Sequence, residues 1–260
     1  TPTELARAGK TAGLSLMALT DHDCMKGVPE FLAEASQIGL HGIPGVELSA
    51  EVPVGQLHLV GLGFNYHDTE LSARFERLLN GRAERNQAML TAFQHLGIDL
   101  TDSEVRAFAG DELVSRVHFA QALIARGLAI DIKDAFARFL GKGACCYRDR
   151  FRYTPSDCIA MLRNAGGIAV MAHPLSLDQN LTQLELKIKH LRDLGLEAME
   201  CFYSTYDTET TLELLRIAKR LDLLPSIGSD FHGAPKPTIH LGHLSASPKT
   251  ELRWMERLSI

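Results

Sequence analysis

The stretch LSLMALTDHD, residues 14–23, decides the fold, because an apolar run typical of a buried strand ends in acidic and imidazole side chains. Two later stretches have the same design: GIAVMAHP at residues 167–174 and LLPSIGSDFH at residues 223–232. The carboxyl ends of strands converge at one mouth of an α/β barrel, so motifs far apart in the chain can build one site. Histidine and carboxylate together suit a zinc, manganese or iron site that activates water.

The composition is ordinary for a globular protein and leaves room for a small anionic substrate. The 260 residues are 45% hydrophobic and 23% charged, enough for a sizeable core and one large α/β domain with or without an insertion. A net charge of −5 and the lack of a long basic stripe argue against duplex DNA as a partner. Five cysteines without CxxC spacing indicate a reduced, cytoplasmic protein. We see no signal peptide. No apolar run approaches the ~20 residues that are needed to span a membrane.

Apolar periodicity and capping residues predict alternating helices and strands on both sides of a purely helical stretch. Thr1, Pro2 and Glu4 have the pattern of a helix start, with Thr1 as the N-cap. This order favours a mostly parallel α/β sheet. Strands are expected at 14–19, 43–50, 56–64, 168–171, 198–202 and 224–227, and the later helices at 27–38, from 154, at 181–194 and at 207–221.

Residues 67–150 differ in character from the rest of the chain. They contain twelve basic and twelve acidic side chains, and we see no convincing strand there. Helices are predicted at 68–96, 102–109, 115–126 and 132–140. We therefore expect a discontinuous α/β domain, residues 1–66 and 151–260, interrupted by an all-helical insertion at 67–150.

Each candidate metal ligand also has a purely structural explanation when taken alone. His22, between Asp21 and Asp23, could belong to a helix N-cap cluster instead of binding a metal. His173, held at the end of its strand by Pro174, could be an ordinary turn residue.

The other candidates have similar alternatives. A buried Glu47 requires a cation or hydrogen-bonding partner, which an arginine could also provide, and a lone His58 on a strand is commonly a core or surface residue. Asp230 and His232 are the most specific pair, since residues two apart in an extended chain point the same way. Coincidence explains poorly why all these motifs fall in or after strands.

Together the motifs resemble the polymerase-and-histidinol-phosphatase (PHP) superfamily. The matching elements, in the family's order, are TDH at 20–22, GVE at 45–47, His58 before LVGLG at 59–63, AHP at 172–174 and GSDFH at 228–232. The chain further resembles the bacterial branch that acts on 3′,5′-nucleoside bisphosphates and RNA 5′ ends. That branch has a helical insertion similar to 67–150, including GRAER at 81–85, SRVHFA at 115–120 and GK at 141–142.

The resemblance implies a distorted seven-stranded β/α barrel of the PHP type, related in design to the TIM barrel. The family begins with a strand carrying His-x-His and then a Ser-Asp-Gly turn, and neither is present in this sequence. We expect the natural polypeptide to include that strand, because a barrel without it would expose backbone edges and an apolar slot. The first strand and its ligands are therefore absent from this chain.

The resemblance also implies a metal-dependent phosphoesterase that uses two or three divalent ions, with Mn²⁺ expected and Zn²⁺ or Fe²⁺ as alternatives. Asp21 would handle protons beside the catalytic His22 and His173. The implied metal ligands are His22, Glu47, His58, His173, Asp230 and His232, and the implied substrate-binding residues are Arg82, Arg116, His118 and Lys142.

The implied substrate is a 3′,5′-nucleoside bisphosphate such as adenosine 3′,5′-bisphosphate, converted to a 5′-monophosphate, or the 5′ end of short single-stranded RNA. Arg82 and Arg85 could instead solvate a helix, and Lys142 a loop. Other open functions are a PHP phosphatase acting on histidinol phosphate and, if the first motif is truly lost, a non-catalytic metal- or nucleotide-binding domain.

Overall fold

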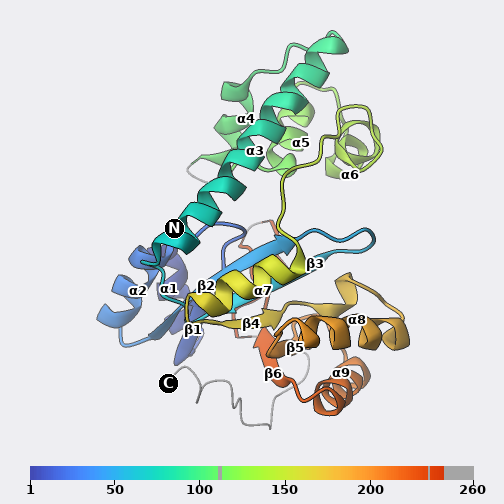
Figure 1. The fold of residues 1–260 in the computed structure, drawn as a ribbon. Helices are drawn as coiled ribbons and strands as arrows, with labels where there is room; N and C mark the ends of the chain where they lie inside the picture. Colours follow the sequence, from blue (N-terminus) through green and yellow to red (C-terminus); the bar gives the residue numbers. More distant parts are fainter. Residues whose placement is uncertain (111–112, 234, 243–260) are drawn as a thin grey trace. The chain divides into compact units, whose positions relative to one another are not determined.

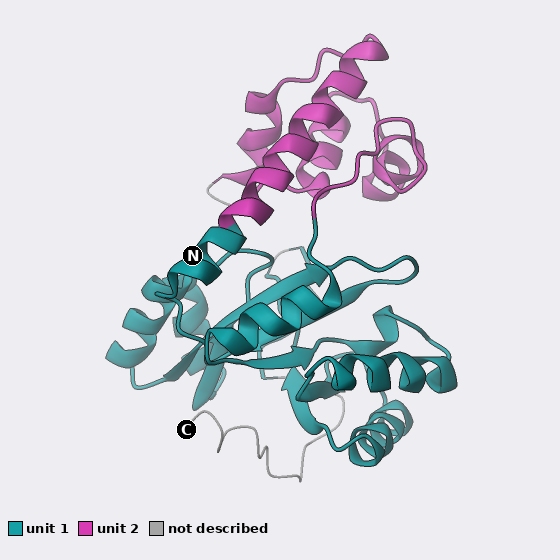
Figure 2. Cartoon of the chain, in the orientation of Figure 1, with its two compact units in different colours: residues 1–75, 152–260 teal, residues 76–151 magenta. Residues whose placement is uncertain are grey.

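The computed structural model describes residues 1–110, 113–233 and 235–242. The chain forms two compact units, one of residues 1–75 and 152–260 and the other of residues 76–151 (Figure 2). Among the described residues, no helix combines the length and apolar character needed to cross a lipid bilayer.

The first unit is built on one six-stranded sheet whose strands are hydrogen-bonded in chain order and which curls into a half-barrel (Figure 1). Three of its pairings are parallel, and β3 runs antiparallel to both of its neighbours, β2 and β4. The strands are β1 (Leu16–Leu19), β2 (His41–Ala50), β3 (Leu57–Leu62), β4 (Ile168–Met171), β5 (Ala198–Tyr203) and β6 (Leu224–Gly228).

The reversal of β3 follows from a short hairpin. Only six residues join β2 to β3, which is too few for the crossover that a parallel pair needs. Gly55 in this turn has φ +78, and a Cβ there would lie 2.3 Å from the Leu177 carbonyl oxygen. The expectation of a mostly parallel sheet therefore holds for β1–β2 and for β4–β6 and fails at β3.

The helices of this unit begin where polar side chains cap them. Thr1 and Glu4 form the expected capping box, and Thr154, Asn180 and Asp207 accept hydrogen bonds at later helix starts. The helices are α1 (Pro2–Thr11), α2 (Val28–Gln37), α7 (Pro155–Asn164), α8 (Leu181–Asp193) and α9 (Thr208–Arg220), with a 3₁₀ turn, η2, at Pro174–Ser176.

Two apolar clusters among the described residues of this unit position the site. One lines a single face of the sheet and includes Ile43 of β2, Val60 of β3 and Val170 of β4. The other lies around Phe31 of α2, which is fully buried and packs with residues of α1 and β1. Side chains two residues apart on a strand share a face, so each core-lining strand can carry polar groups on the same face at its end.

The second unit is entirely helical within its described residues. Its core is formed by apolar side chains of all its helices, with Phe93 and Phe119 fully enclosed. The expected helix at 132–140 changes into a π-turn, in which the Gly141 amide donates to the carbonyl oxygen of Phe136. The elements are α3 (Thr69–His95, from residue 76 in this unit), α4 (Asp102–Ala109), α5 (Arg116–Ala125), α6 (Ile132–Ala135) and the π-helical η1 (Phe136–Leu140).

Replacing Phe31 with alanine tests the packing of α2 onto the sheet. Because the ring is 0% exposed, Phe31→Ala should lower the unfolding free energy by about 3–5 kcal/mol, measured by urea denaturation with circular dichroism. Leu212→Ala, at a side chain that is 47% exposed, is the control and should change it by less than about 1 kcal/mol. Equal losses for the two variants would contradict this packing.

Candidate metal centre

Glu47 and His58 reach one place because the sheet register brings them there. In the β2–β3 ladder Glu47 is paired with Val60 and Ser49 with His58, so Glu47 and His58 are diagonal neighbours on one face. This face also carries the apolar core around Ile43 and Val60. The core thus ends in a carboxylate and an imidazole at one rim of the half-barrel.

The loop after β1 is fixed to the same rim by backbone hydrogen bonds. The Glu47 amide donates to the Asp21 carbonyl at 3.1 Å, and the Asp23 amide donates to the Glu47 carbonyl at 2.8 Å. These bonds make a parallel bridge between His22 and Glu47 and bring Nδ1 of His22 to 3.5 Å from Oε2 of Glu47. The Asp23 side chain, fully buried, accepts from the Ser49 amide at 3.1 Å.

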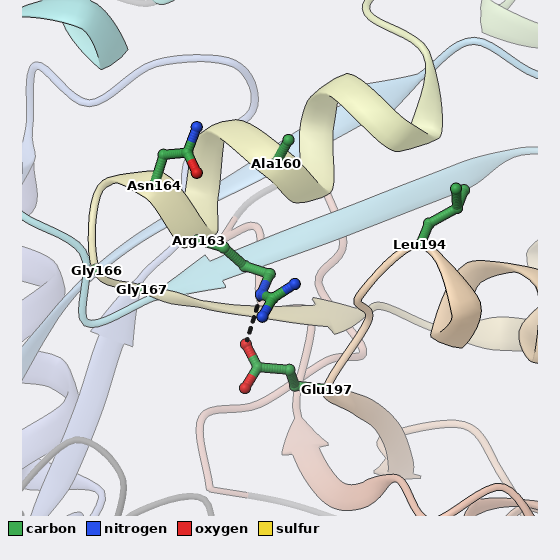
Figure 3. A pocket seen from close by; sticks show the side chains of 7 residues that line it. All are labelled: Ala160, Arg163, Asn164, Gly166, Gly167, Leu194 and Glu197. Atoms are coloured by element: carbon green, nitrogen blue, oxygen red, sulfur yellow. Dashed lines mark ion pairs between the residues drawn. The ribbon is translucent and has the colours of Figure 1, made fainter.

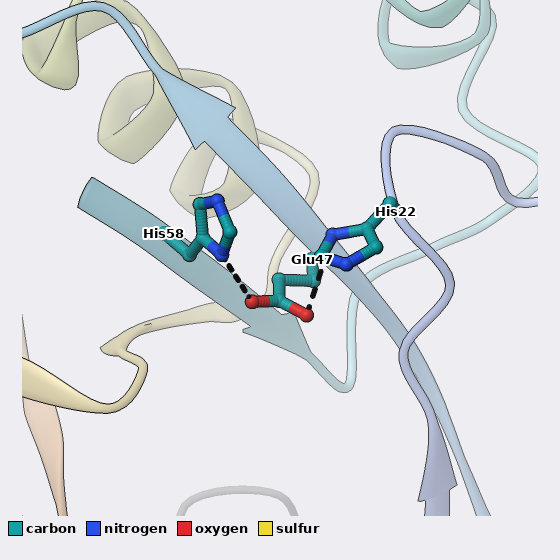
Figure 4. A group of neighbouring side chains, drawn as sticks. All are labelled: His22, Glu47 and His58. Carbon is teal, nitrogen blue, oxygen red and sulfur yellow. Dashed lines mark hydrogen bonds and ion pairs between the residues drawn. The ribbon is translucent and has the colours of Figure 1, made fainter. Parts of the chain in front are cut away.

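Glu47 is the centre of the cluster. Its Oε1 lies 2.7 Å from Nδ1 of His58, and its Oε2 faces His22 (Figure 4). The same Oε1 lies 3.0 Å from Nε2 of His173. Ligand atoms of His22, Glu47 and His58 all lie within 4.8 Å of one another, close enough to share one ion. Glu47 is only 5% exposed, so its charge requires compensation from these imidazoles or from a cation.

His173 is held by its neighbours in an unusual backbone conformation. It has φ +28, its amide donates to Oε2 of Glu200 at 2.7 Å, and its Nδ1 lies 2.8 Å from the Ser176 hydroxyl. Positive φ is uncommon outside glycine, and Pro174 further restricts this residue. The ring is thereby directed at Glu47 and at His58, whose Nδ1 is 3.1 Å from Nε2 of His173.

Asp230 and His232, after β6, complete the rim. The Asp230 carboxylate accepts from the Tyr203 hydroxyl at 2.6 Å and contacts Nζ of Lys236 at 2.5 Å through the same oxygen, Oδ2. The ring of His232 is 5.6 Å from the ring of His22, centroid to centroid. The chain therefore brings all six expected ligands together at one rim; Tyr203 and Lys236 join them in this structure.

The ionisation of the cluster reflects a balance between burial and neighbouring charge. Burial opposes ionisation of Glu47, yet hydrogen bonds from His173 and His58 hold its pKa well below the usual range. Burial likewise lowers the pKa of His22, although Glu47 opposes this. For His173, burial is outweighed by the Glu47 carboxylate, and its pKa is raised. Burial also raises the pKa of Glu200, to about 7.

The arrangement fits a divalent ion. Nδ1 of His22 is buried and has no hydrogen-bond partner, although it lies beside a carboxylate oxygen. An imidazole nitrogen without a partner, next to a second imidazole and a carboxylate, is the donor set that zinc and other first-row ions bind. Glu200 accepts a hydrogen bond from the His173 amide, and the Ser176 hydroxyl contacts Nδ1 of its ring. Metal-binding histidines are commonly oriented by such hydrogen bonds.

Asp21 and Asp23 have opposite environments. The Asp21 side chain is exposed, next to Gly27, whereas Asp23 is buried against β2 with φ +53. Glu200, Tyr203 and Lys236 gave weaker sequence signals, since a glutamate, a tyrosine and a lysine near strand ends are common on protein surfaces. Positive φ at Asp23, His173 and Asp230 marks the three loops that carry ligands or their neighbours.

The candidate substrate-binding residues Arg82, Arg116, His118 and Lys142 lie within the helical unit. Arg116 donates to the Leu140 carbonyl at 3.2 Å, and its guanidinium lies over the Phe136 and Tyr147 rings. His118 is 9% exposed, and its Nδ1 accepts from the Ser115 amide. Arg82 is half-buried on α3, and Lys142 is exposed in the loop after η1.

Arg85 corrects one interpretation of the sequence. It does not solvate the surface of α3, because it is only 6% exposed and its Nε donates to the Asn86 side chain at 2.8 Å. The reason is that this face of α3 lies against the core of the helical unit, with the Asn86 amide group donating to the Val114 carbonyl.

A polar pocket lies elsewhere in the sheet unit, where β4 begins (Figure 3). It has a volume of about 410 Å³, and its charged groups are Arg163 and Glu197, 3.6 Å apart. Glycines 166 and 167 shape its wall. The carboxyl end of β4 leads to His173, so this pocket is at the opposite end of that strand from the imidazole cluster and holds none of its residues.

Two curated proteins are similar to this chain over most of its length. The chain is 31% identical over 249 residues to a 3′,5′-nucleoside bisphosphate phosphatase of Chromobacterium violaceum, covering 95% of this chain and 87% of the relative. It is also 31% identical over 241 residues to a 5′-3′ exoribonuclease of Haemophilus influenzae, covering 93% and 87%. No model of a known protein family matches the chain.

Solved structures agree with the fold and the family. A C. violaceum protein described as an amidohydrolase, with bound sulfate, matches with a TM-score of 0.86 and 30% identity over 100% of this chain and 91% of its own. A Bifidobacterium adolescentis protein described as a "putative metal-dependent phosphoesterase" matches with a TM-score of 0.82 and 27% identity, over 99% and 91%. With a His and Glu cluster suited to a divalent ion, the chain belongs to the PHP-type metal-dependent phosphoesterases.

Proposed function

We propose that this hydrolase removes a phosphate from small nucleotides that carry phosphates at both ends of the ribose, such as adenosine 3′,5′-bisphosphate, leaving a nucleoside 5′-monophosphate. Short single-stranded RNA with a 5′ phosphate is a second substrate of the same chemistry. Both substrates agree with the names of the relatives and with an overall charge of −5, which favours short anions over long duplexes.

The observation that carries this proposal is the Glu47 carboxylate enclosed by three imidazoles. Oε1 of Glu47 lies 2.7 Å from His58 and 3.0 Å from His173, and Oε2 lies 3.5 Å from His22. We assign the ligands of two or three divalent ions, Mn²⁺ by preference, to this set and its neighbours after β6. The assigned ligands are His22, Glu47, His58, His173, Asp230 and His232.

When bound, such ions lower the pKa of a coordinated water towards ~7 and offset the charge of the phosphate oxygens. The residues of the chain fix the geometry around them. Glu200 and Ser176 orient His173, and Tyr203 orients the Asp230 carboxylate by donating to Oδ2 at 2.6 Å. Asp21, exposed at the rim, is assigned to proton handling with the solvent.

Phosphate recognition away from the cluster is assigned to the helical unit. The candidate phosphate-binding side chains of this unit are cationic or hydrogen-bonding groups, which suit phosphate oxygens. Arg116 is held by the Leu140 carbonyl and by two aromatic rings, so it keeps a defined orientation at the loop that carries Lys142. Arg82 and His118 belong to the same unit.

The finer fold and the cellular location are also proposals. We assign the six-stranded sheet to a seven-stranded PHP-type barrel with the helical unit as an insertion, supported by a TM-score of 0.86 to a solved structure. Free thiols at all five cysteines support a cytoplasmic location.

His173→Ala tests the phosphatase assignment. The intact enzyme, supplied with Mn²⁺, should release phosphate from adenosine 3′,5′-bisphosphate, and the variant should lose at least about 100-fold in kcat/KM. Substituting a residue that hydrogen-bonds to a metal ligand commonly lowers metal affinity or activity 10–100-fold, so substituting the ligand itself should lower activity further. His190→Ala, at an exposed histidine of α8, is the matched control and should keep full activity. Equal phosphate release by both variants would exclude the assignment.

Metal content provides a test that does not depend on the substrate. After dialysis against Mn²⁺, elemental analysis should find more than one ion per chain, because the six assigned ligands are proposed to hold two or three ions. Glu47→Gln should lower the bound metal by at least one ion, since it removes the carboxylate that three imidazoles surround. Unchanged stoichiometry in this variant would place the metal elsewhere.

Glu200 should make the stability of the metal-free protein depend on pH. Burial raises the pKa of Glu200 in the folded protein to about 7, from 4.5 in the unfolded chain. The stabilisation that the protonated side chain gives is therefore complete below pH 4.5 and is lost as the pH rises towards 7. The loss corresponds to about 3 kcal/mol. In chelator-treated protein, the unfolding free energy should therefore fall between about pH 4.5 and 7. Glu200→Gln should abolish this fall, whereas the control Glu209→Gln, at an exposed site, should retain it. If the unfolding free energies of the two variants had identical pH profiles, Glu200 would not be a buried carboxyl with a raised pKa.

A further inference from the structure

Two adjacent cysteines in the helical unit form a pair that the phosphoesterase chemistry does not use. Cys145 and Cys146 lie in the loop that follows η1, and their sulfur atoms are 3.9 Å apart. The Cys145 thiol contacts the Arg138 carbonyl at 3.2 Å, and Arg148 donates to the Cys145 carbonyl at 3.3 Å. Both sulfurs therefore lie on the same side of one peptide link.

The two thiols differ in their access to solvent. Cys145 is exposed, whereas Cys146 is 0% exposed and belongs to the apolar core of the helical unit. Burial raises the pKa of Cys146 to about 12, so this thiol is shielded from oxidants in solvent, and its sulfur has that of Cys145 as a neighbour at 3.9 Å. An oxidant from solvent therefore reaches Cys145 first, and Cys146 is the buried thiol next to it.

The backbone of this loop can adapt to a new bond. It consists of successive turns, in which the Ala144 amide donates to the Gly141 carbonyl and the Tyr147 amide donates to the Ala144 carbonyl. Gly143 adds a φ of +88 with open space around its Cα. For the peptide between the two cysteines to rotate, two hydrogen bonds have to break: the one from the Cys146 amide to the Phe139 carbonyl at 3.0 Å and the one from Arg148 to the Cys145 carbonyl. No strand ladder has to break.

We propose that Cys145 and Cys146 are a reversible oxidation site that forms a vicinal disulfide when the protein meets a hydroperoxide. The Cys145 sulfur takes one oxygen from hydrogen peroxide and becomes a sulfenic acid, and one water leaves. The Cys146 sulfur then attacks the Cys145 sulfur, the S–O bond breaks and a second water leaves. The two thiols lose two electrons and two protons, and the peroxide is reduced to two waters.

The geometry makes this disulfide a labile one. Consecutive Cα atoms are about 3.8 Å apart, below the usual range of about 4.4–6.8 Å for a disulfide, so the eight-membered ring is strained. Strained disulfides have higher reduction potentials and are easily reduced by cellular thiols. The bond also has to draw the Cys146 sulfur out of the core of the helical unit, which should loosen that unit.

Intact-mass spectrometry of the full chain tests the proposal. Folded protein is treated with a small excess of hydrogen peroxide, quenched, denatured and labelled with N-ethylmaleimide. The expected species is about 2 Da lighter before labelling and takes three maleimides in place of five, and dithiothreitol restores five. Peptide mapping should find the link between Cys145 and Cys146, and the oxidised chain should melt a few degrees lower (~2–4 °C).

Two variants separate this chemistry from other oxidation. Cys145→Ser, at an exposed position, should abolish the mass loss, whereas Cys158→Ser, at a buried cysteine of α7, should keep it. Accumulation of sulfinic or sulfonic acid on Cys145 without the lighter species would overturn the proposal. Disulfide-linked dimers of the wild type in place of the lighter monomer would overturn it as well.

Discussion

The structure of the sheet unit depends on how it accommodates one buried carboxylate. Glu47 is 5% exposed inside β2, where an uncompensated charge would be severely destabilising. Three imidazoles from the loop after β1, from β3 and from the loop after β4 surround it. Four of the six strands, β1 to β4, therefore bring side chains to one group whose charge the three imidazoles compensate, and a divalent ion would compensate it more completely.

The same strands connect the cluster to the core. On β2 and β3 the face that buries Ile43 and Val60 continues into Glu47 and His58, so the apolar packing that sets the register also sets the positions of the ligands. The loops that carry His173 and Asp230 have positive φ, which they keep through hydrogen bonds to Glu200 and contacts with Tyr203 and Lys236. A defined site on a rigid sheet is what catalysis of phosphate transfer requires.

Much of this could be predicted from the sequence, because the local rules are strong. The capping box at Thr1 and Glu4 and the strand at Ile168–Met171 are found where the pattern predicts them. The alternation of helices and strands does not show the direction of β3, but the short interval between the strands expected at 43–50 and 56–64 does, since it leaves no room for a crossover. That reversal explains why His58 lies at the start of its strand, whereas His22, His173 and Asp230 follow theirs. The burial of Glu200 and Arg85 depends on packing between distant segments, which periodicity does not reveal.

The most direct test of the account is the position of a bound ion. In a crystal of the protein soaked with Mn²⁺, we expect an anomalous scattering peak at about 2.0–2.2 Å from the Glu47 carboxylate and from nitrogens of His22 and His58. Such a peak would show that the buried charge, the imidazoles and the ion form one centre. Full Mn²⁺ binding with every peak away from Glu47 would contradict the account, because the carboxylate would then serve only the fold.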